Sequence, residues 1–488
     1  MLLITAVSCG KWLEGTSSSQ VSDEKMFSSR NGFHEAVTGV YIAMTSADCY
    51  GRNYTFYANE LSSVNYNPVE NTVFKSWQQH SYDNVTTTAV IESMWKSGYF
   101  IIANANKILY ELERRRDVIT DDWEYNMLKG EMLAVRAYVH FDLMRMFGLE
   151  SWNGDNAGKR TVPYVTAYSL ESTAQKTYSE TAEMLYADIE GALRCLENDP
   201  VRGVYPEDFD TVLNADGYWN NRRLHLNYYA VEALAARVAF WAGDYAAAQE
   251  KASDVAENAI GEGRAVEWID ADAEIKKTGN DSRDWSFSSE HLFSLDVNDL
   301  YSLTTGYCYG GTEVNMSLPS TDIENILFAR STSDGVNDGA EDIRGYALLL
   351  KYGGAGYYSY KLYSSSSMDE KYRNRMPMIR ISEMYYIMAF SALDEDRTDV
   401  AEDCLRAVMS HRGYTDLAFD GSKESLRRAL AYDVVREFLG EGQLFYWAKM
   451  AGRLGLSSFD RSVMEKSPEN LMYPYPNSET TYGHVQEK

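Results

Sequence analysis

Residues 130–148 read GEMLAVRAYVHFDLMRMFG, and this stretch decides the fold class. Leu128, just before it, and Met132, Val135 and Val139 within it fall at offsets of 0, 4, 7 and 11, which places them on one face of an α-helix. Apolar residues also occupy the flanks of that face, so we expect the helix to be buried on most sides. A long buried helix predicts a core built from packed helices.

Two other segments have the pattern of a helix hairpin. Residues 231–241 carry an apolar stripe, Gly243 and Asp244 supply a turn, and residues 246–255 continue as a second helix. Residues 384–393 and 399–409 repeat this arrangement around the polar sequence DEDR. Small alanines where two helices approach, joined by a short polar turn, are typical of tetratricopeptide-like (TPR-like) packing. The repeat is irregular, so the sequence predicts an all-α fold with TPR-like helix hairpins and no regular array.

Composition limits the partners. The formal net charge is −26, so the surface repels phosphate backbones, and no nucleic-acid partner is predicted. The same charge opposes adsorption to anionic membranes, so membrane association requires an anchor. The five cysteines are far apart and form no CxxC pair, which argues against a zinc cluster. No metal or other cofactor is predicted.

Long stretches without helical periodicity separate the helical blocks, at about 48–85, 200–224 and 263–375. They are rich in Gly, Ser, Asn, Asp and aromatic residues. Loops longer than about 15 residues are usually functional or disordered, and the density of Trp and Tyr argues against disorder here. A helical scaffold that carries aromatic loops on one face is typical of a binding protein.

The N-terminus predicts a lipid anchor. Residues 1–8 (MLLITAVS) are apolar and Cys9 follows directly, as at the end of a bacterial lipoprotein signal, although the basic start of such a signal is missing. Residues 10–30 are polar and Ser-rich, as expected for a tether. We therefore divide the chain into a signal remnant with a lipidated Cys9 (1–9), a tether (10–30) and a single helical domain (31–488).

Several blocks resemble the SusD/RagB family of Bacteroidetes outer-membrane nutrient-binding lipoproteins, in the same order along the whole chain. The most specific is Gly130–Gly148, followed by VPYV at 162–165. The others are Cys9 with Trp12–Glu14, Trp95 with Asn104 and Asn106, Ala235–Ala248, Met376–Leu393, Arg436–Gln443 and Tyr473–Glu479. Two positions depart from the family pattern: where it has an arginine and an aspartate after the Glu–Gly of the C-terminal signature, this chain has Leu444 and Trp447.

The resemblance implies a function. Members of this family are non-catalytic, lie at the outer membrane as surface-exposed, lipid-anchored proteins, and act as a lid on a SusC-like TonB-dependent transporter. They capture an oligosaccharide, a polysaccharide or another nutrient. Their binding loops diverge while the helical scaffold persists, so the resemblance predicts a glycan ligand without identifying it.

A glycan site needs aromatic faces for sugar C–H surfaces, with polar side chains beside them for hydroxyl groups. For each aromatic ring, burial as an anchor of its loop is the alternative interpretation. Loop residues of these two kinds are the candidates: Trp77, Tyr82, Trp219, Trp285, Tyr307 and Tyr309 as stacking rings, with Asn220 and Arg222 as hydroxyl partners.

Other patterns are weaker. Tyr357–Tyr360 is better explained by packing, and the acidic segment Asp334–Asp342 fits a solvated loop better than a Ca²⁺ site because it lacks EF-hand spacing.

Two rival functions stay open. An α-helical glycosidase would turn over a glycan, whereas a TPR-like scaffold for a peptide or protein would have a long groove lined by Asn and Lys instead of exposed rings.

Overall fold

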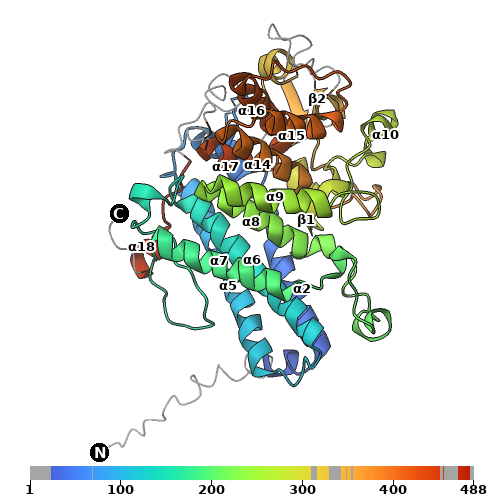
Figure 1. Ribbon diagram of the computed structural model, residues 1–488. Coiled ribbons are helices and arrows are strands. Elements are labelled where there is room, and N and C mark those ends of the chain that lie inside the picture. Colours follow the sequence, from blue (N-terminus) through green and yellow to red (C-terminus); the bar gives the residue numbers. More distant parts are fainter. Residues whose placement is uncertain are drawn as a thin grey trace, which may run out of the picture.

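The computed structural model (Figure 1) describes residues 23–68, 70–308, 316–328, 342–347, 349–352, 356–450, 454 and 471–483. Its long helices are α2 (Arg30–Met44), α5 (Val85–Arg114), α6 (Asp122–Phe147), α7 (Tyr178–Cys195), α8 (Tyr228–Ala242), α9 (Tyr245–Asn258), α14 (Ile381–Asp394), α15 (Thr398–Ser410) and α16 (Lys423–Phe438). Shorter helices are α3 (Ala58–Ser63), α4 (Thr72–Gln78), α10 (Ala271–Lys276), α11 (Leu300–Thr305), α12 (Ser320–Asp322), α13 (Ile343–Ala347), α17 (Leu444–Met450) and α18 (Asn477–Tyr482).

Helices that follow one another along the chain pack side by side. Contacts join α5 to α6, α6 to α7, α8 to α9, α9 to α14 and α14 to α15, and Figure 1 shows them as a continuous stack. Local chemistry sets the turns: Gly243 ends α8 with φ of 78°, a left-handed conformation that glycine adopts without strain. Thr177 and Glu180 form a complete capping box at the start of α7. The predicted all-α scaffold with TPR-like hairpins is confirmed.

Helix α6 contains residues 130–147 of the opening stretch, and it packs between α5 and α7. Almost every residue from Met127 onward is buried, including those outside the apolar stripe. Gly130 permits the close approach of the end of α7, because a Cβ at that position would lie 2.7 Å from Leu196 Cγ. The expectation of a helix buried on most sides is confirmed.

Two small antiparallel sheets interrupt the helical architecture. β1 (His291–Asp296) pairs with β4 (Arg375–Arg380), which leads directly into α14, and β2 (Leu349–Tyr352) pairs with β3 (Gly356–Ser359). These strands bring parts of the long stretch 263–375 back to the scaffold. They were not distinguishable from irregular loop by sequence periodicity, because each is short.

Buried ion pairs fasten α16 beneath the loops. Glu437 accepts hydrogen bonds from Arg344 at 2.8 Å and from Arg412 at 2.7 Å, and it also pairs with Arg380. Burial alone would raise the pKa of Glu437, but the guanidinium groups of Arg380 and Arg412 hold it well below its usual range. Arg412 also pairs with Glu290 at 2.6 Å. Removing one member would leave a buried charge uncompensated, so this network fixes the relative positions of β4, α16 and the preceding loops.

The described apolar residues form one large contiguous core from Phe27 to Tyr473, with a small satellite core beside it. At the two departures from the family pattern, Leu444 and Trp447 are buried, and Trp447 packs against Phe240 and Phe438. Aromatic packing therefore occupies the place of the ion pair that the family pattern would put there. Among the described residues, no helix is long and apolar enough to cross a membrane.

Residues 1–22, and with them Cys9, lie outside the described part of the chain. The first described residue, Asp23, forms an ion pair with Lys107 of α5, with 2.6 Å between Oδ1 and Nζ. The division into signal remnant, tether and single domain stays a prediction. Most of the acidic segment 334–342 is also outside the described residues, but Asp342 itself is buried and pairs with Arg344 at 2.7 Å, so at this residue the expectation of a solvated loop is wrong.

Candidate ligand-binding site

Trp77 belongs to the core. Its side chain is 0% exposed, and its ring packs edge-on against Tyr57 and Tyr473, with centroids 6.5 and 5.8 Å away. The short helix α4 lies between α3 and α5, and Trp77 is on its inward side. A fully buried ring offers no face to a sugar. The prediction of Trp77 as a stacking residue is therefore corrected: it anchors α4.

Trp219 and Arg222 are also structural. Trp219 is 1% exposed and meets the ring of Trp123 edge-on at 5.1 Å. Arg222 Nη1 donates to Glu131 at 2.5 Å, and its Nη2 donates to Asp199 at 2.9 Å. Both carboxylates are 0% exposed in their side chains, so this guanidinium is fully committed to buried ion pairs. The predicted roles in stacking and hydroxyl binding are wrong for these two residues.

Trp285 is 1% exposed, in the satellite core with Ile269, Phe287, Ile343 and Met368. Its indole Nε1 donates to the carbonyl of Asn280 at 2.8 Å, which closes the loop over it. The third predicted tryptophan is thus corrected as well. All three corrections have one cause: a large ring gains more free energy from burial beneath a long loop than a smaller side chain does.

The remaining candidates are more accessible but are not gathered at one place. Tyr82 is partly exposed, and its ring packs against Trp77 and Tyr473. Tyr307 is partly exposed and contacts Tyr57, whereas Asn220 is exposed in the loop before α8. Tyr309 lies outside the described residues. Tyr82, Tyr307 and Asn220 stay predictions.

A solvent-open groove lies where α4 ends and α5 begins. It has a volume of about 420 Å³, and its lining residues are Lys75, Ser76, Gln79, Ser81, Asp83 and Asn84. Three of them also form the turn, since Ser81 Oγ donates to Asp83 Oδ1 at 2.7 Å and Asn84 caps α5 by accepting from the backbone of Thr86. In the sequence, Tyr82 lies between the lining residues Ser81 and Asp83. The groove therefore lies between the end of α4, which Trp77 anchors, and the start of α5.

The residues that line the groove are all polar, so the aromatic face that a glycan site needs would have to come from a neighbouring residue such as Tyr82. An ammonium, an amide, hydroxyl groups and a carboxylate offer donors and acceptors at a solvent-open surface, and the volume lies in the range of small-molecule sites. Among the described residues, no group of three or more His, Cys, Asp or Glu side chains is placed to hold a metal ion. The groove lies within the predicted loop stretch 48–85, and its lining side chains are mainly polar neighbours of Trp77 that an analysis of aromatic residues passes over.

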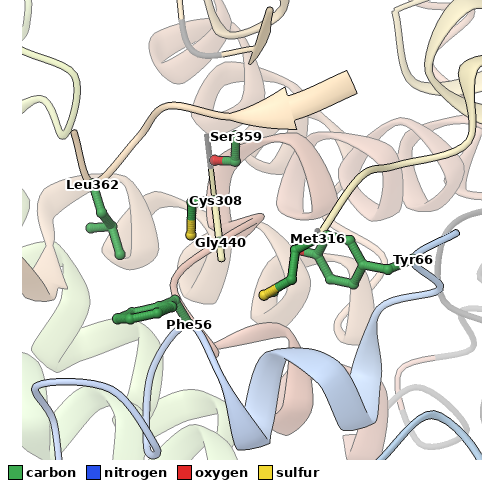
Figure 2. A pocket seen from close by; sticks show the side chains of 7 residues that line it. All are labelled: Phe56, Tyr66, Cys308, Met316, Ser359, Leu362 and Gly440. Carbon is green, nitrogen blue, oxygen red and sulfur yellow. The ribbon is translucent and has the colours of Figure 1, made fainter. Parts of the chain in front are cut away.

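A second cavity lies deeper, under the loops (Figure 2). Phe56, Tyr66, Cys308, Met316, Ser359, Leu362 and Gly440 line it. Its volume of about 10 Å³ suffices for about one water molecule, so it is too small for a sugar ring. The lining residues come from segments far apart in the sequence, and the cavity marks where the loops meet the scaffold.

Glu60 fixes this junction. Its carboxylate accepts from the backbone N–H groups of Gly440 at 2.7 Å and Gly442 at 2.9 Å, and from the hydroxyl of Tyr66 at 3.0 Å. Burial raises the pKa of Glu60 to about 7, and these three donors limit the rise. α3 is therefore tied to the segment after α16, which holds the floor beside the groove in place.

A comparison with protein families finds one match. Residues 11–207 match a SusD-like family model described as starch-binding associating with outer membrane. Over these residues the chain is similar to SusD-like proteins. This confirms the resemblance found in the sequence, and the groove lies inside the matched residues. A comparison with curated proteins gives no significant match.

Solved structures share the fold of this chain. A SusD superfamily protein from Bacteroides thetaiotaomicron VPI-5482 matches with a TM-score of 0.65 and 20% identity, over 93% of this chain and 98% of that one. A SusD-like carbohydrate binding protein from Bacteroides vulgatus ATCC 8482 matches with a TM-score of 0.66 and 15% identity, over 93% and 96%. A laminarin binding SusD-like protein matches with a TM-score of 0.61 and 17% identity, over 94% and 98%.

Proposed function

We propose that this SusD-like protein is a non-catalytic glycan-binding lipoprotein, anchored through a lipid on Cys9 and exposed at the surface of the outer membrane. It captures an oligosaccharide or polysaccharide and delivers it to a SusC-like TonB-dependent transporter. The match of residues 11–207 to a family described by starch binding and outer-membrane association carries this proposal. Carbohydrate and laminarin binding by proteins of the same fold supports it.

The groove between α4 and α5 is the proposed contact site. Gln79 and Asp83 are exposed lining residues, so their polar atoms can exchange water for sugar hydroxyl groups at little cost. Tyr82 supplies the neighbouring ring, and Tyr307, Tyr309 and Asn220 are further candidates. Buried Trp77 anchors α4 beside this surface, and a pre-organised surface loses less entropy on binding.

Affinity electrophoresis of a soluble protein spanning residues 10–488 tests the proposal. The gels contain plant, microbial and host polysaccharides, with starch and laminarin among them. We expect at least one polysaccharide to retard the protein. The double variant Gln79→Ala/Asp83→Ala should lose this retardation, whereas Asp117→Ala, which removes an exposed carboxylate outside the groove, should keep it. Absence of retardation on every gel, together with capture of a peptide ligand, would support the peptide-scaffold alternative instead.

The anchor has a separate test. Cells that express the full chain are expected to incorporate labelled fatty acid into the protein and to hold it in the outer-membrane fraction. Cys9→Ser should abolish both, whereas Cys195→Ser, which changes a partly exposed thiol on α7, should abolish neither. Fatty-acid incorporation that survives in Cys9→Ser would refute lipidation at this residue.

A further inference from the structure

One side of α5 exposes apolar side chains that belong to neither hydrophobic core. Phe100 is 60% exposed and Tyr110 is 51% exposed. The loop before α7 adds Leu170, which is fully exposed, and Tyr168, which is 50% exposed. The ring centroids of Tyr110 and Tyr168 lie 6.0 Å apart. We name Phe100, Tyr110, Tyr168 and Leu170 the α5 apolar surface, and packing within the two cores does not account for it.

Lys107 fastens the start of the described chain to this surface. It follows Phe100 by seven residues, or about two turns, so the two side chains lie on the same side of α5. Its Nζ lies 5.7 Å from the ring centroid of Tyr168 and 5.9 Å from that of Phe27. The same ammonium forms the ion pair with Asp23, at 2.6 Å. The chain that precedes Asp23 therefore enters the protein beside the α5 apolar surface.

The segment before Asp23 carries side chains that can cover this surface. Residues 10–22 read GKWLEGTSSSQVS, in which Trp12 and Leu13 form an adjacent pair of large apolar residues. Trp12 precedes Asp23 by eleven residues, and an extended chain of that length spans up to about 36–40 Å. The surface extends only about 10 Å along α5 from Lys107 to Phe100. Trp12 can therefore reach the whole of it.

Two observations favour contact over a free spacer. A spacer needs length and polar residues, and a Trp–Leu pair supplies neither. Against exposed apolar side chains, which mark interaction sites, the same pair gains free energy by burial. In addition, the match to the family model begins at residue 11, ahead of α2, so most of the segment 10–22 belongs to the matched unit.

We propose that the α5 apolar surface is the docking site of the chain's own segment 10–22, with Trp12 and Leu13 packed against Phe100 and Tyr168. The contact does not depend on glycan binding. Its consequence rests on the proposed lipid on Cys9. A docked segment leaves three residues, roughly 10 Å of chain, between Cys9 and the docked Trp12, whereas an undocked one leaves fourteen residues and roughly 50 Å before Asp23. Docking thus holds the protein close to its lipid and limits its orientations at the membrane.

Hydroxyl-radical footprinting of the soluble protein spanning residues 10–488, which contains both hydrophobic cores, tests the contact. The variant Trp12→Ser/Leu13→Ser removes the apolar pair and keeps the chain length. The rings of Phe100 and Tyr168 should react at least about threefold faster in this variant than in the wild type, because docking covers them. Tyr205, which is 58% exposed elsewhere, should react equally in both proteins.

Two further variants complete the test. Ser17→Asn/Ser18→Asn changes the same segment without touching the apolar pair, so the rings should keep their wild-type reactivity. In Phe100→Ser/Tyr168→Ser the surface itself is changed, and oxidation of Trp12 should rise at least about threefold above the wild type. The changed surface residues lie outside both cores, so this variant should stay folded, which circular dichroism checks.

Equal reactivity of Phe100 and Tyr168 in the wild type and in Trp12→Ser/Leu13→Ser would overturn the proposal. A wild-type Trp12 that is oxidised as fast as in the urea-unfolded chain would also overturn it. Ring protection that increases with protein concentration would assign the surface to a second copy of the chain and exclude the segment 10–22 as its occupant. None of these results bears on the proposed glycan binding, which is tested separately.

Discussion

Trp77→Ala separates a core residue from a ligand-binding residue. The structure places the ring at 0% exposure between Tyr57, Tyr82 and Tyr473. Truncation of a buried tryptophan to alanine lowers the free energy of unfolding by about 3–5 kcal/mol, through lost burial and the cavity left behind. The indole Nε1 has no hydrogen-bond partner among the described residues, so no hydrogen-bond loss adds to this figure.

Thermal and urea unfolding, followed by circular dichroism, measure this change. Trp77→Ala should move both midpoints far below those of the wild type. Tyr482→Ala, which removes a ring that is 81% exposed, should stay within about 0.5 kcal/mol of the wild type. A Trp77→Ala protein with wild-type unfolding midpoints and no glycan binding would refute the reasoning, because the ring would then face the ligand.

Three further predictions concern buried groups. Because the pKa of Glu60 is raised to about 7 in the folded state, its contribution to stability is full below about pH 4.5 and is lost as the pH rises through 7. The urea midpoint of the wild type should therefore fall as the pH rises across this range, and that of Glu60→Gln should fall less. For Glu131, the effect of burial is outweighed by His225 and Arg222, which lower its pKa to about 2. Its contribution to stability is therefore present above about pH 4.5 and is lost as the pH falls towards 2, so acid unfolding should be steeper in the wild type than in Glu131→Gln. At pH 7, Glu131→Gln should lower the free energy of unfolding by about 3–5 kcal/mol. Gly130→Ala should destabilise by about 1–3 kcal/mol because its Cβ would meet α7, whereas Gly39→Ala, on the open face of α2, should stabilise by up to about 1 kcal/mol in the same melts.

The helical scaffold was predictable because its signals are local and repeated. The stripe around Met132 and the Gly243 turn follow from helix geometry and backbone conformation, which do not depend on distant residues. The strands of the segment 263–375 were not predictable, since β1 and β4 pair across a separation of about eighty residues and neither is long enough to show a period.

The proposed groove lies within a predicted loop stretch, 48–85, but its lining side chains were not among the predicted residues. Tryptophan is a residue type that often stacks on sugars, so Trp77 and Trp285 were reasonable candidates. Sequence alone cannot distinguish an exposed ring from a buried ring that anchors its loop. The groove residues Gln79 and Asp83 carry no periodic or motif signal, because their role depends on how α4 is placed against α5. Arg222 illustrates the same limit: its carboxylate partners come from α6 and from the loop after α7.

Calorimetric titration of the groove variant tests whether the glycan binds between α4 and α5. The polysaccharide that retards the wild type in affinity electrophoresis is titrated into the wild type, Gln79→Ala/Asp83→Ala and Asp117→Ala. The melting temperatures of the three proteins are first shown to agree. Loss of two polar ligand contacts is expected to weaken the affinity at least tenfold in the double variant, with wild-type affinity in Asp117→Ala. Equal affinity in all three proteins would contradict the assignment of the glycan site to the groove between α4 and α5.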